Sequence, residues 1–304
     1  MAIVLGCNDV GSAVARALHG SGWSVVLVDE ADPPWHRRGM AFTNAWYIGN
    51  AELDGAGACF CASLKSIPSV LAHGMIAATT WSWRNVADAL HAEVLVDAGR
   101  SRHRPEILRG RVALTIGIGP DFIAGEDVDV AIEGSVDADR VQPSHAQECG
   151  DSAFTARRKS YVVASTRFGR FMTERRIGDS VCAGEKIGAV GHETVAAPAS
   201  GVLLGLAARG ARIQPGDELV EVDTNGVPHR CHGIGAGPRA VAESVLAVLA
   251  RRGEAVDGTV QPTLPATGMA GKISGGRDPA PEVAPLAAAV ATEENAAGPP
   301  VIGP

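Results

Sequence analysis

The sequence predicts an α/β protein in which a doubly wound parallel sheet is followed by a small all-β unit and a C-terminal helix. Residues 2–29 read as strand, turn, helix and strand, and further strand-like runs follow up to residue 133. A repeat with an offset of 32 residues occupies residues 164–222. A chain of 304 residues is long enough for two domains and a tail.

The first unit begins with an apolar run, Ala2–Leu5, which is too short for a helix and stops at Gly6. A turn follows, and Ser12 opens a helical segment that two glycines end. Residues 24–28 form a second apolar strand that leads to Asp29. This order of elements is the opening unit of a Rossmann-like sheet of the dinucleotide-binding type.

The turn of this unit is the first candidate site. A helix N-terminus carries unpaired N–H groups and about half a positive charge, so Gly6, Gly11 and Ser12 are candidates to hold an anion. Asp29 is placed to accept a ribose hydroxyl. The Gly-x-Gly-x-x-Gly pattern is incomplete, and Asp9 adds a negative charge where a pyrophosphate would lie. A structural turn with a capping aspartate is therefore the competing interpretation.

Strand and helix patterns continue along the chain. We expect strands at residues 59–62, 75–79, 93–98, 111–116 and 129–133, and helices at 63–73 and 81–90. In this architecture the loops after parallel strands share one edge of the sheet, where ligands bind. The Rossmann-like domain is placed at residues 1–140, and residues 141–160 are expected to form a linker.

A glycine-rich loop at residues 117–125 is the second candidate site. Gly117, Gly119 and Gly125 permit positive φ and close approach of a ligand, while Pro120 holds one corner. N–H groups exposed there would cradle a phosphate or another anion. A tight connection between two elements is the alternative. The acids near this loop match no metal-loop spacing, so a cation is not expected.

Other polar groups are weaker candidates. Arg37 and Arg38 follow the second strand, where a basic pair can meet a phosphate, although a solvated basic loop is an equal alternative. Cys59 and Cys61 are expected to be packed thiols. No metal site is predicted, because His229 and its neighbours lack a suitable ligand set. No catalytic constellation is recognised, so catalytic residues stay unknown and enzymatic activity stays open.

The repeat pairs residues 164–190 with residues 196–222. One half alone leaves an apolar face uncovered, so the two halves are expected to pack together. This predicts a barrel-sandwich hybrid, the architecture of biotinyl and lipoyl carriers, which with a final helix occupies residues 161–253. The hairpin at 191–194 has no lysine to modify. We therefore expect a binding or docking module, not a carrier.

The final helix is expected at residues 238–252, with Gly253 just beyond its end. Residues 254–304 are rich in Pro, Ala and Gly and contain no aromatic residue, which predicts a disordered tail.

Composition excludes several classes of function. The formal net charge of −7 does not favour nucleic-acid binding. No apolar run approaches the roughly 20 residues that span a bilayer, and no leader-like segment follows Met1. Six scattered cysteines suggest reduced thiols. A cytoplasmic protein without membrane or nucleic-acid partners is expected.

These motifs together resemble one family, the accessory proteins of selenium-dependent molybdenum hydroxylase systems, which are distantly akin to xanthine dehydrogenase maturation factors. Residues 117–125 match the family's Gly-x-Gly-Pro-x-Phe-x-Ala-Gly at every fixed position. Residues 33–42 are similar to Pro-x-x-x-Arg-Arg-x-x-x-Phe, and residues 96–98 match a Val-Asp-Ala step. The opening turn resembles the family's only in part, since Asp9 is kept and three glycines are not. A Gly-His step that the family has after Glu133 is absent.

The resemblance covers about residues 3–249 and implies an accessory or maturation factor for a molybdenum-containing hydroxylase client. Such a factor would bind a small anionic ligand, a pterin- or nucleotide-type cofactor or precursor, with the molybdenum cofactor or a nucleotide as candidates. Its expected cofactor-binding residues are Gly6, Asp9, Gly11, Ser12, Asp29, Arg37, Arg38, Gly117, Gly119, Pro120 and Gly125. The alternatives are an NAD(P)-dependent oxidoreductase with Asp29 on the ribose, and a scaffold whose loops stay empty. Neither the oligomeric state nor a role for selenium follows from the sequence.

Overall fold

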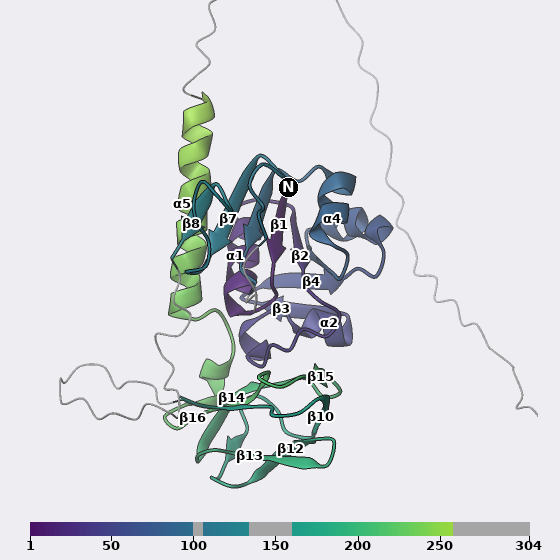
Figure 1. Ribbon diagram of the computed structural model, residues 1–304, viewed down its shortest axis with the longest axis vertical. Coiled ribbons are helices and arrows are strands. Elements are labelled where there is room, and N and C mark those ends of the chain that lie inside the picture. Colours follow the sequence, from purple (N-terminus) through teal and green to yellow (C-terminus); the bar gives the residue numbers. More distant parts are fainter. Residues whose placement is uncertain (100–105, 134–159, 258–304) are drawn as a thin grey trace, which may run out of the picture. The chain divides into compact units, whose positions relative to one another are not determined.

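The computed structural model of this chain describes residues 1–99, 106–133 and 160–257. Within these ranges it is a mixed α/β protein with one large sheet, two smaller sheets and a C-terminal helix (Figure 1). The predicted α/β class is confirmed at this level. The predicted linker, apart from Ser160, and the predicted tail from residue 258 onward lie outside the described residues.

The large sheet has the strand order β3-β4-β5-β2-β1-β6-β7-β8 in the described part of the chain. Its neighbouring strands are parallel, except for the antiparallel hairpin of β3 and β4. The strands are β1 (Ala2–Leu5), β2 (Val25–Val28), β3 (Asn50–Leu53), β4 (Ala56–Phe60), β5 (Ile76–Thr79), β6 (Val94–Asp97), β7 (Leu114–Ile118) and β8 (Val130–Ile132). The hairpin strand β3 was not expected from the sequence. We call residues 1–99 and 106–133 the α/β module.

Strand register places the candidate loops at one edge of this sheet. Val28 pairs with Leu5, Leu5 with Asp97, and Asp97 with Gly117. The loops that follow β2, β1, β6 and β7 therefore leave from one row of residues, as the parallel pattern predicted. The chain runs from β1 to β2 on one side and returns to β6 on the other. Ligands of open α/β sheets bind at such a switch point.

Helices cover both faces of the large sheet (Figure 1). They are α1 (Asp9–Gly20), α2 (Asn44–Ile48), α3 (Ile67–Ala72), α4 (Trp83–Leu90) and α5 (Ala236–Asp257), with short 3-10 turns η1 (Arg38–Met40), η2 (Leu64–Ser66) and η3 (Pro228–Cys231). Because strand side chains alternate between faces, Val4 packs in one core with residues of α1 and α5, and Ile3 in another with residues of α3 and α4.

Two helices extend beyond their expected ranges. The first helix begins at Asp9 and not at Ser12, because the Asn8 side chain accepts hydrogen bonds from the N–H groups of Val10 and Gly11 and caps the helix there. The last helix continues through Gly253 to Asp257. A single glycine lowers helix stability by only about 1 kcal/mol, which does not by itself end a helix.

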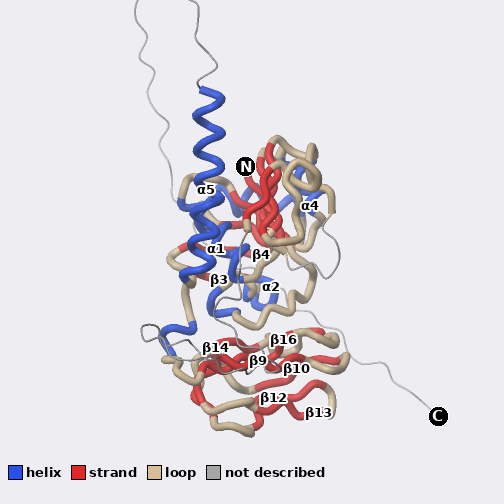
Figure 2. Tube along the Cα trace, turned by 60° about the vertical axis from the view of Figure 1, so that its left-hand side comes forward, coloured by secondary structure: helices blue, strands red, loops and turns tan. Residues whose placement is uncertain are grey.

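The two smaller sheets form the β module, residues 160–223 (Figure 2). One sheet has the order β13-β12-β10-β15 and the other β11-β14-β16-β9. Their bounds are β9 (Ser160–Ala164), β10 (Gly169–Thr173), β11 (Ser180–Val181), β12 (Lys186–Val190), β13 (Glu193–Ala196), β14 (Gly201–Leu206), β15 (Arg212–Ile213) and β16 (Glu218–Asp223). Phe171 from one sheet and Leu203 and Val222 from the other share one apolar core.

The sequence repeat relates these two sheets to each other. An offset of 32 residues carries β10 onto β14, β11 onto β15 and β12 onto β16. When each strand of the first sheet is shifted by 32 residues, forward or backward, it falls on a strand of the second sheet. The shifted strands have the order of that second sheet, β9-β16-β14-β11. Each sheet contains strands from both halves of the repeat, so neither half completes a sheet alone.

Helix α5 divides its apolar residues between two environments. Ala242 and Val245 are buried in the core that includes α1, whereas Ala240, Ala247 and Ala250 are exposed. Among the described residues, the segment 228–252 is long and apolar enough to be a candidate membrane span, and 11% of its most apolar part is buried. The sequence was expected to contain no such segment. The exposed alanines contribute to this apolar character without forming a large apolar surface.

Packing of α5 on the α/β module can be tested at Val245. We expect Val245→Ala to lower the free energy of unfolding by about 2 kcal/mol, because it removes buried methyl groups and leaves a cavity. Exposed Ala247→Ser is the control and should change it by less than about 0.5 kcal/mol. Urea denaturation of both variants measures the difference. Equal midpoints would show that α5 does not pack there.

Candidate functional site

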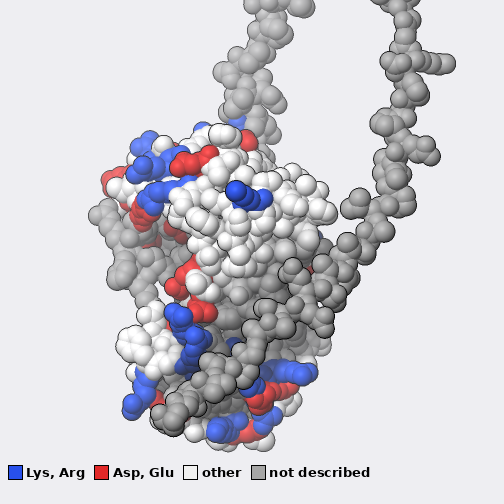
Figure 3. All heavy atoms as spheres, turned by 90° about the vertical axis from the view of Figure 1, so that its right-hand side faces the viewer, with Lys and Arg blue, Asp and Glu red and all other residues white. Residues whose placement is uncertain are grey.

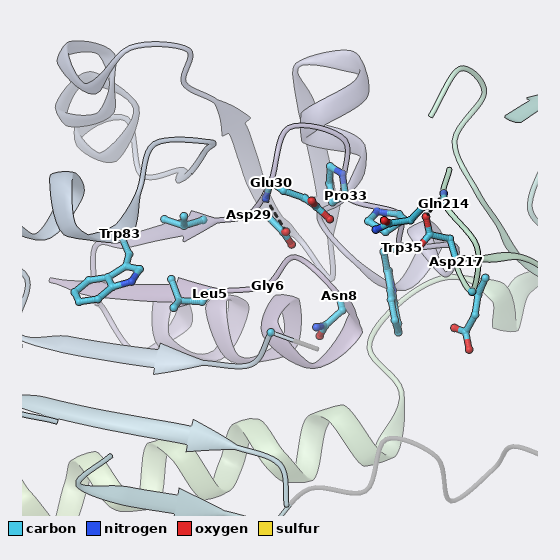
Figure 4. A pocket seen from close by; sticks show the side chains of 15 residues that line it. Leu5, Gly6, Asn8, Asp29, Glu30, Pro33, Trp35, Trp83, Gln214 and Asp217 are labelled. Carbon is cyan, nitrogen blue, oxygen red and sulfur yellow. Dashed lines mark hydrogen bonds between the residues drawn. The ribbon is translucent and has the colours of Figure 1, made fainter. Parts of the chain in front are cut away.

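A cavity of about 780 Å³ opens at the switch point between β1 and β6 (Figure 4). The α/β module lines it with the tips of β1 and β2, residues 33–35, Trp83 and Gly99, and the β module contributes the turn 214–218. In Figure 4 Trp83 lies at one end and Trp35 at the other, with Asp29 between them. The cavity therefore has an aromatic side chain at each end and joins both modules.

Glycines shape the floor of this cavity. Gly6 has a φ of +91°, and a Cβ there would lie 2.9 Å from the Cα of Gly99. A Cβ on Gly11 would lie 1.9 Å from the carbonyl oxygen of Gly6. The Asn8 amide donates to the Ala98 carbonyl over 2.7 Å. Gly6 therefore lets the loops after β1 and β6 pack against each other, and Gly11 lets the start of α1 pack against the turn that precedes it.

The N–H groups of the turn already have partners within the chain. Asn8 Oδ1 accepts from Val10 N–H at 3.0 Å and from Gly11 N–H at 2.9 Å. The N–H of Cys7 donates to Asp29 Oδ2 over 2.6 Å. Ser12 is fully buried, and its hydroxyl donates to the Cys7 carbonyl. Anion binding by Gly6, Gly11 and Ser12 stays a prediction, and the geometry favours a structural role for them.

Two half-buried carboxylates, Asp29 and Asp97, lie at the strand tips of the switch point. Burial raises the pKa of Asp29, which lines the cavity. Burial, with a contribution from Asp29, also raises the pKa of Asp97 to about 6, although Gly99 N–H donates to it over 2.8 Å. Both carboxyl groups therefore lie where a negative charge is penalised.

The lining of the cavity is acidic. Its charged residues are Asp29, Glu30, Asp217 and Glu218, and no lysine or arginine is among the described residues that line it. Carboxylates accept hydrogen bonds and repel anions. The cavity therefore fits a ligand surface that carries N–H or O–H donors, and does not fit a bare phosphate.

Arg37 lies beside the cavity in a buried ion cluster. Its guanidinium donates to both carboxylate oxygens of Glu221, over 2.6 and 2.7 Å, and lies 3.6 Å from Asp9. His36 Nε2 is 2.9 Å from the same carboxylate. Burial alone would raise the pKa of Glu221, but hydrogen bonds from Arg37 and His36 hold it well below its ordinary value. Arg37 thus joins the two modules through Glu221 and pairs with Asp9 within its own module. Neither Arg37 nor Asp9 is among the cavity-lining residues.

Arg38 is also absent from this lining. It donates to the Leu206 carbonyl over 2.8 Å and to Asn44 Oδ1 over 2.6 Å. It faces a second pocket, on the β-module side of η1 and α2.

The loop 117–125 lies at the expected sheet edge, but it does not line the cavity. A Cβ on Gly117 would lie 2.3 Å from the ring of Phe122, which covers this glycine. Gly119 N–H donates to Ile132 and Gly125 N–H to Val128. Pro120 is exposed at the turn. These bonds hold the loop in place, and its predicted contact with a ligand stays a prediction.

Several site residues were missed from the sequence. Trp35, Trp83 and the turn 214–218 come together only through the tertiary fold. Glu221 did have a signal, because it is a charged residue in the otherwise apolar run 219–222. A buried charge requires a partner.

No cluster of metal ligands stands out in the described part of the chain. No group of three or more His, Cys, Asp or Glu side chains there is arranged to hold a metal ion. On the face drawn in Figure 3, basic and acidic side chains are interspersed.

Comparison with known proteins gives one distant relative. The chain is 24% identical over 257 residues to a protein of Escherichia coli (strain K12) named "Uncharacterized protein YqeB". The alignment covers 82% of this chain and 47% of that protein, so the chain spans about half the length of the relative it matches. No family model matches the chain.

The ion cluster predicts a large effect of Glu221→Gln. The change leaves Arg37 and His36 buried without their shared carboxylate, and we expect a loss of about 3–5 kcal/mol at pH 7. Because the folded pKa of Glu221 is lowered, its contribution is complete above the unfolded pKa of about 4.3 and is lost below it. Denaturation at several pH values should show the loss shrinking in acid. Exposed Glu193→Gln is the control, and an equal effect of both variants would contradict this prediction.

Asp97→Asn should have the opposite sign. The folded pKa of about 6 is raised, so the contribution of Asp97 to stability falls as pH rises from about 4 to about 6. Asparagine keeps an acceptor for Gly99 N–H and carries no charge. The variant should gain about 1–3 kcal/mol over the wild type at pH 8 and little at pH 4. A pH-independent difference between the two proteins would show that Asp97 titrates normally.

Proposed function

We propose that this chain is an accessory or maturation factor for a molybdenum-containing hydroxylase, and that it holds a pterin- or nucleotide-type cofactor or precursor in the switch-point cavity. The main support is that strand tips of the α/β module and the turn 214–218 of the β module line this cavity together. The motif at residues 117–125 supports the choice of family. The likeness to YqeB adds no function to this argument.

The proposal includes the two domain types. Parallel strands whose order reverses at β1 support a Rossmann-like domain. Two sheets related by a 32-residue repeat support a barrel-sandwich hybrid. The turn between β12 and β13, at Gly191 and His192, has no lysine. A docking or capping role for the β module is consistent with its share of the cavity wall.

The chemistry of the cavity favours the ring end of such a cofactor. A pterin ring presents N–H and amino donors along one edge, which a carboxylate accepts in pairs. Asp29 and Asp217 lie in the wall as acceptors, and Trp35 and Trp83 offer apolar ring surface. A volume of about 780 Å³ is in the range of small-molecule sites.

Holding and releasing a cofactor requires positioning and no nucleophile, so the proposed factor need not catalyse a reaction. Its cavity wall comes from the strand tips of one module and the turn 214–218 of the other. A cytoplasmic location and a hydroxylase client are part of the proposal.

An NAD(P)-dependent oxidoreductase is the second candidate. Its support is Asp29, which lines the cavity at the tip of β2, where such enzymes bind the ribose. The capped helix start and the nearby Asp9 weigh against a pyrophosphate in the turn.

Ligand binding can be measured through tryptophan fluorescence with a free pterin as the probe. We expect saturable quenching, and Trp83→Ala should weaken binding about ten-fold because ring stacking is lost. Trp81→Ala is a matched control, since Trp81 lies two residues earlier and does not line the cavity. Mass spectrometry of small molecules released from gently purified protein should identify a pterin.

Two outcomes would contradict the proposal. Saturable binding of NADH at micromolar concentration, with no pterin bound, would favour the oxidoreductase. Absence of both ligands would favour an empty scaffold.

A further inference from the structure

A second pocket, of about 360 Å³, lies apart from the acidic cavity and has the opposite charge. Its charged lining residues are Arg38, Arg175, Arg176 and Glu52, and His232 also contributes to the wall. Arg38 and Glu52 come from the α/β module, whereas Arg175 and Arg176 follow β10 in the β module. None of these residues lines the switch-point cavity.

Arg38 is the central cation of this pocket. Its two hydrogen bonds go to neutral oxygens, on Leu206 and Asn44. It forms no ion pair with any carboxylate of the described residues. Burial of this guanidinium lowers its pKa, in agreement with a charge that lacks an anionic partner. A desolvated charge of this kind is costly unless an anion completes it.

The other arginines add to this positive charge. Arg175 pairs with Glu185. Arg176 is exposed, and its guanidinium forms no ion pair within the described part of the chain. With Glu185 counted, three arginines are balanced by two carboxylates, those of Glu52 and Glu185, so the pocket has an excess of positive charge.

We propose that this pocket binds a phosphoryl anion, the phosphate or diphosphate of a small molecule. Arg38 Nε and Nη1 already donate to Leu206 and Asn44, so its Nη2 is the nitrogen that can donate to a phosphoryl oxygen. Arg176 can reach another oxygen of the same group. The volume suits a phosphate or diphosphate group and is small for a whole dinucleotide. This inference goes beyond the proposed function, because it concerns a separate site and needs no pterin.

Calorimetric titration with inorganic pyrophosphate at low salt tests the proposal. We expect saturable binding that weakens as salt is added. Arg176→Gln removes an exposed charge without a hydrogen bond from its side chain, so the fold should survive and affinity should fall about ten-fold. Arg38→Lys keeps the charge but loses the planar guanidinium that Leu206 and Asn44 hold in place, and it should also weaken binding. Glu52→Gln removes the repelling carboxylate and should tighten it.

Arg209→Gln is the matched control, because Arg209 is an exposed arginine of the same module outside the pocket. It changes the net charge as Arg176→Gln does and should leave affinity unchanged. A nucleoside diphosphate titrated in parallel distinguishes the two sources of the anion. If the nucleoside diphosphate binds more tightly than pyrophosphate, the pocket recognises a nucleotide. If the two bind equally, the pocket recognises the phosphoryl group alone. Absence of saturable binding, or equal loss in Arg209→Gln and Arg176→Gln, would overturn the proposal.

Discussion

The arrangement of both pockets depends on the ion cluster that forms around the buried carboxylate of Glu221. This carboxylate lies in an interior strand of the β module and binds His36 and Arg37, which belong to the α/β module. Arg37 in turn reaches Asp9 in the first turn of α1. Removing one member of such a cluster leaves an uncompensated charge, so the segment that carries His36 and Arg37 has little freedom to move. Backbone bonding between His36 and Leu206 reinforces this connection.

This segment also separates two regions of opposite charge. Trp35 faces the cavity lined by carboxylates, whereas Arg38, three residues later, faces the pocket lined by arginines. A ligand with a donor-rich ring and a ligand with phosphoryl oxygens would therefore meet different surfaces. The charge pattern explains why the capped start of α1, beside four cavity acids, is a poor place for a phosphate.

Sequence patterns predicted the elements better than the site. Short apolar strands and the 32-residue repeat depend on local periodicity, and the strands and the relation between the two small sheets follow it. The start of α1 was misplaced because the capping role of Asn8 was not recognised. Gly6 and Gly117 were predicted to allow close approach of a ligand, and in the fold they accommodate Gly99 and Phe122. No spacing rule connects Trp35 with the turn 214–218, because their approach depends on the distant contact of Arg37 with Glu221.

The repeat of the β module has an evolutionary consequence. Duplication of a half-module supplies two copies of every turn, and each copy is then free to acquire its own task. The turn 214–218 borders the acidic cavity, and its counterpart 32 residues earlier is 182–186. Asp217 in the later copy corresponds to Glu185, which pairs with Arg175 at the basic pocket. The later turn thus lines the acidic cavity, whereas the earlier turn holds an arginine that lines the basic pocket, so equivalent positions of the repeat contribute to different pockets.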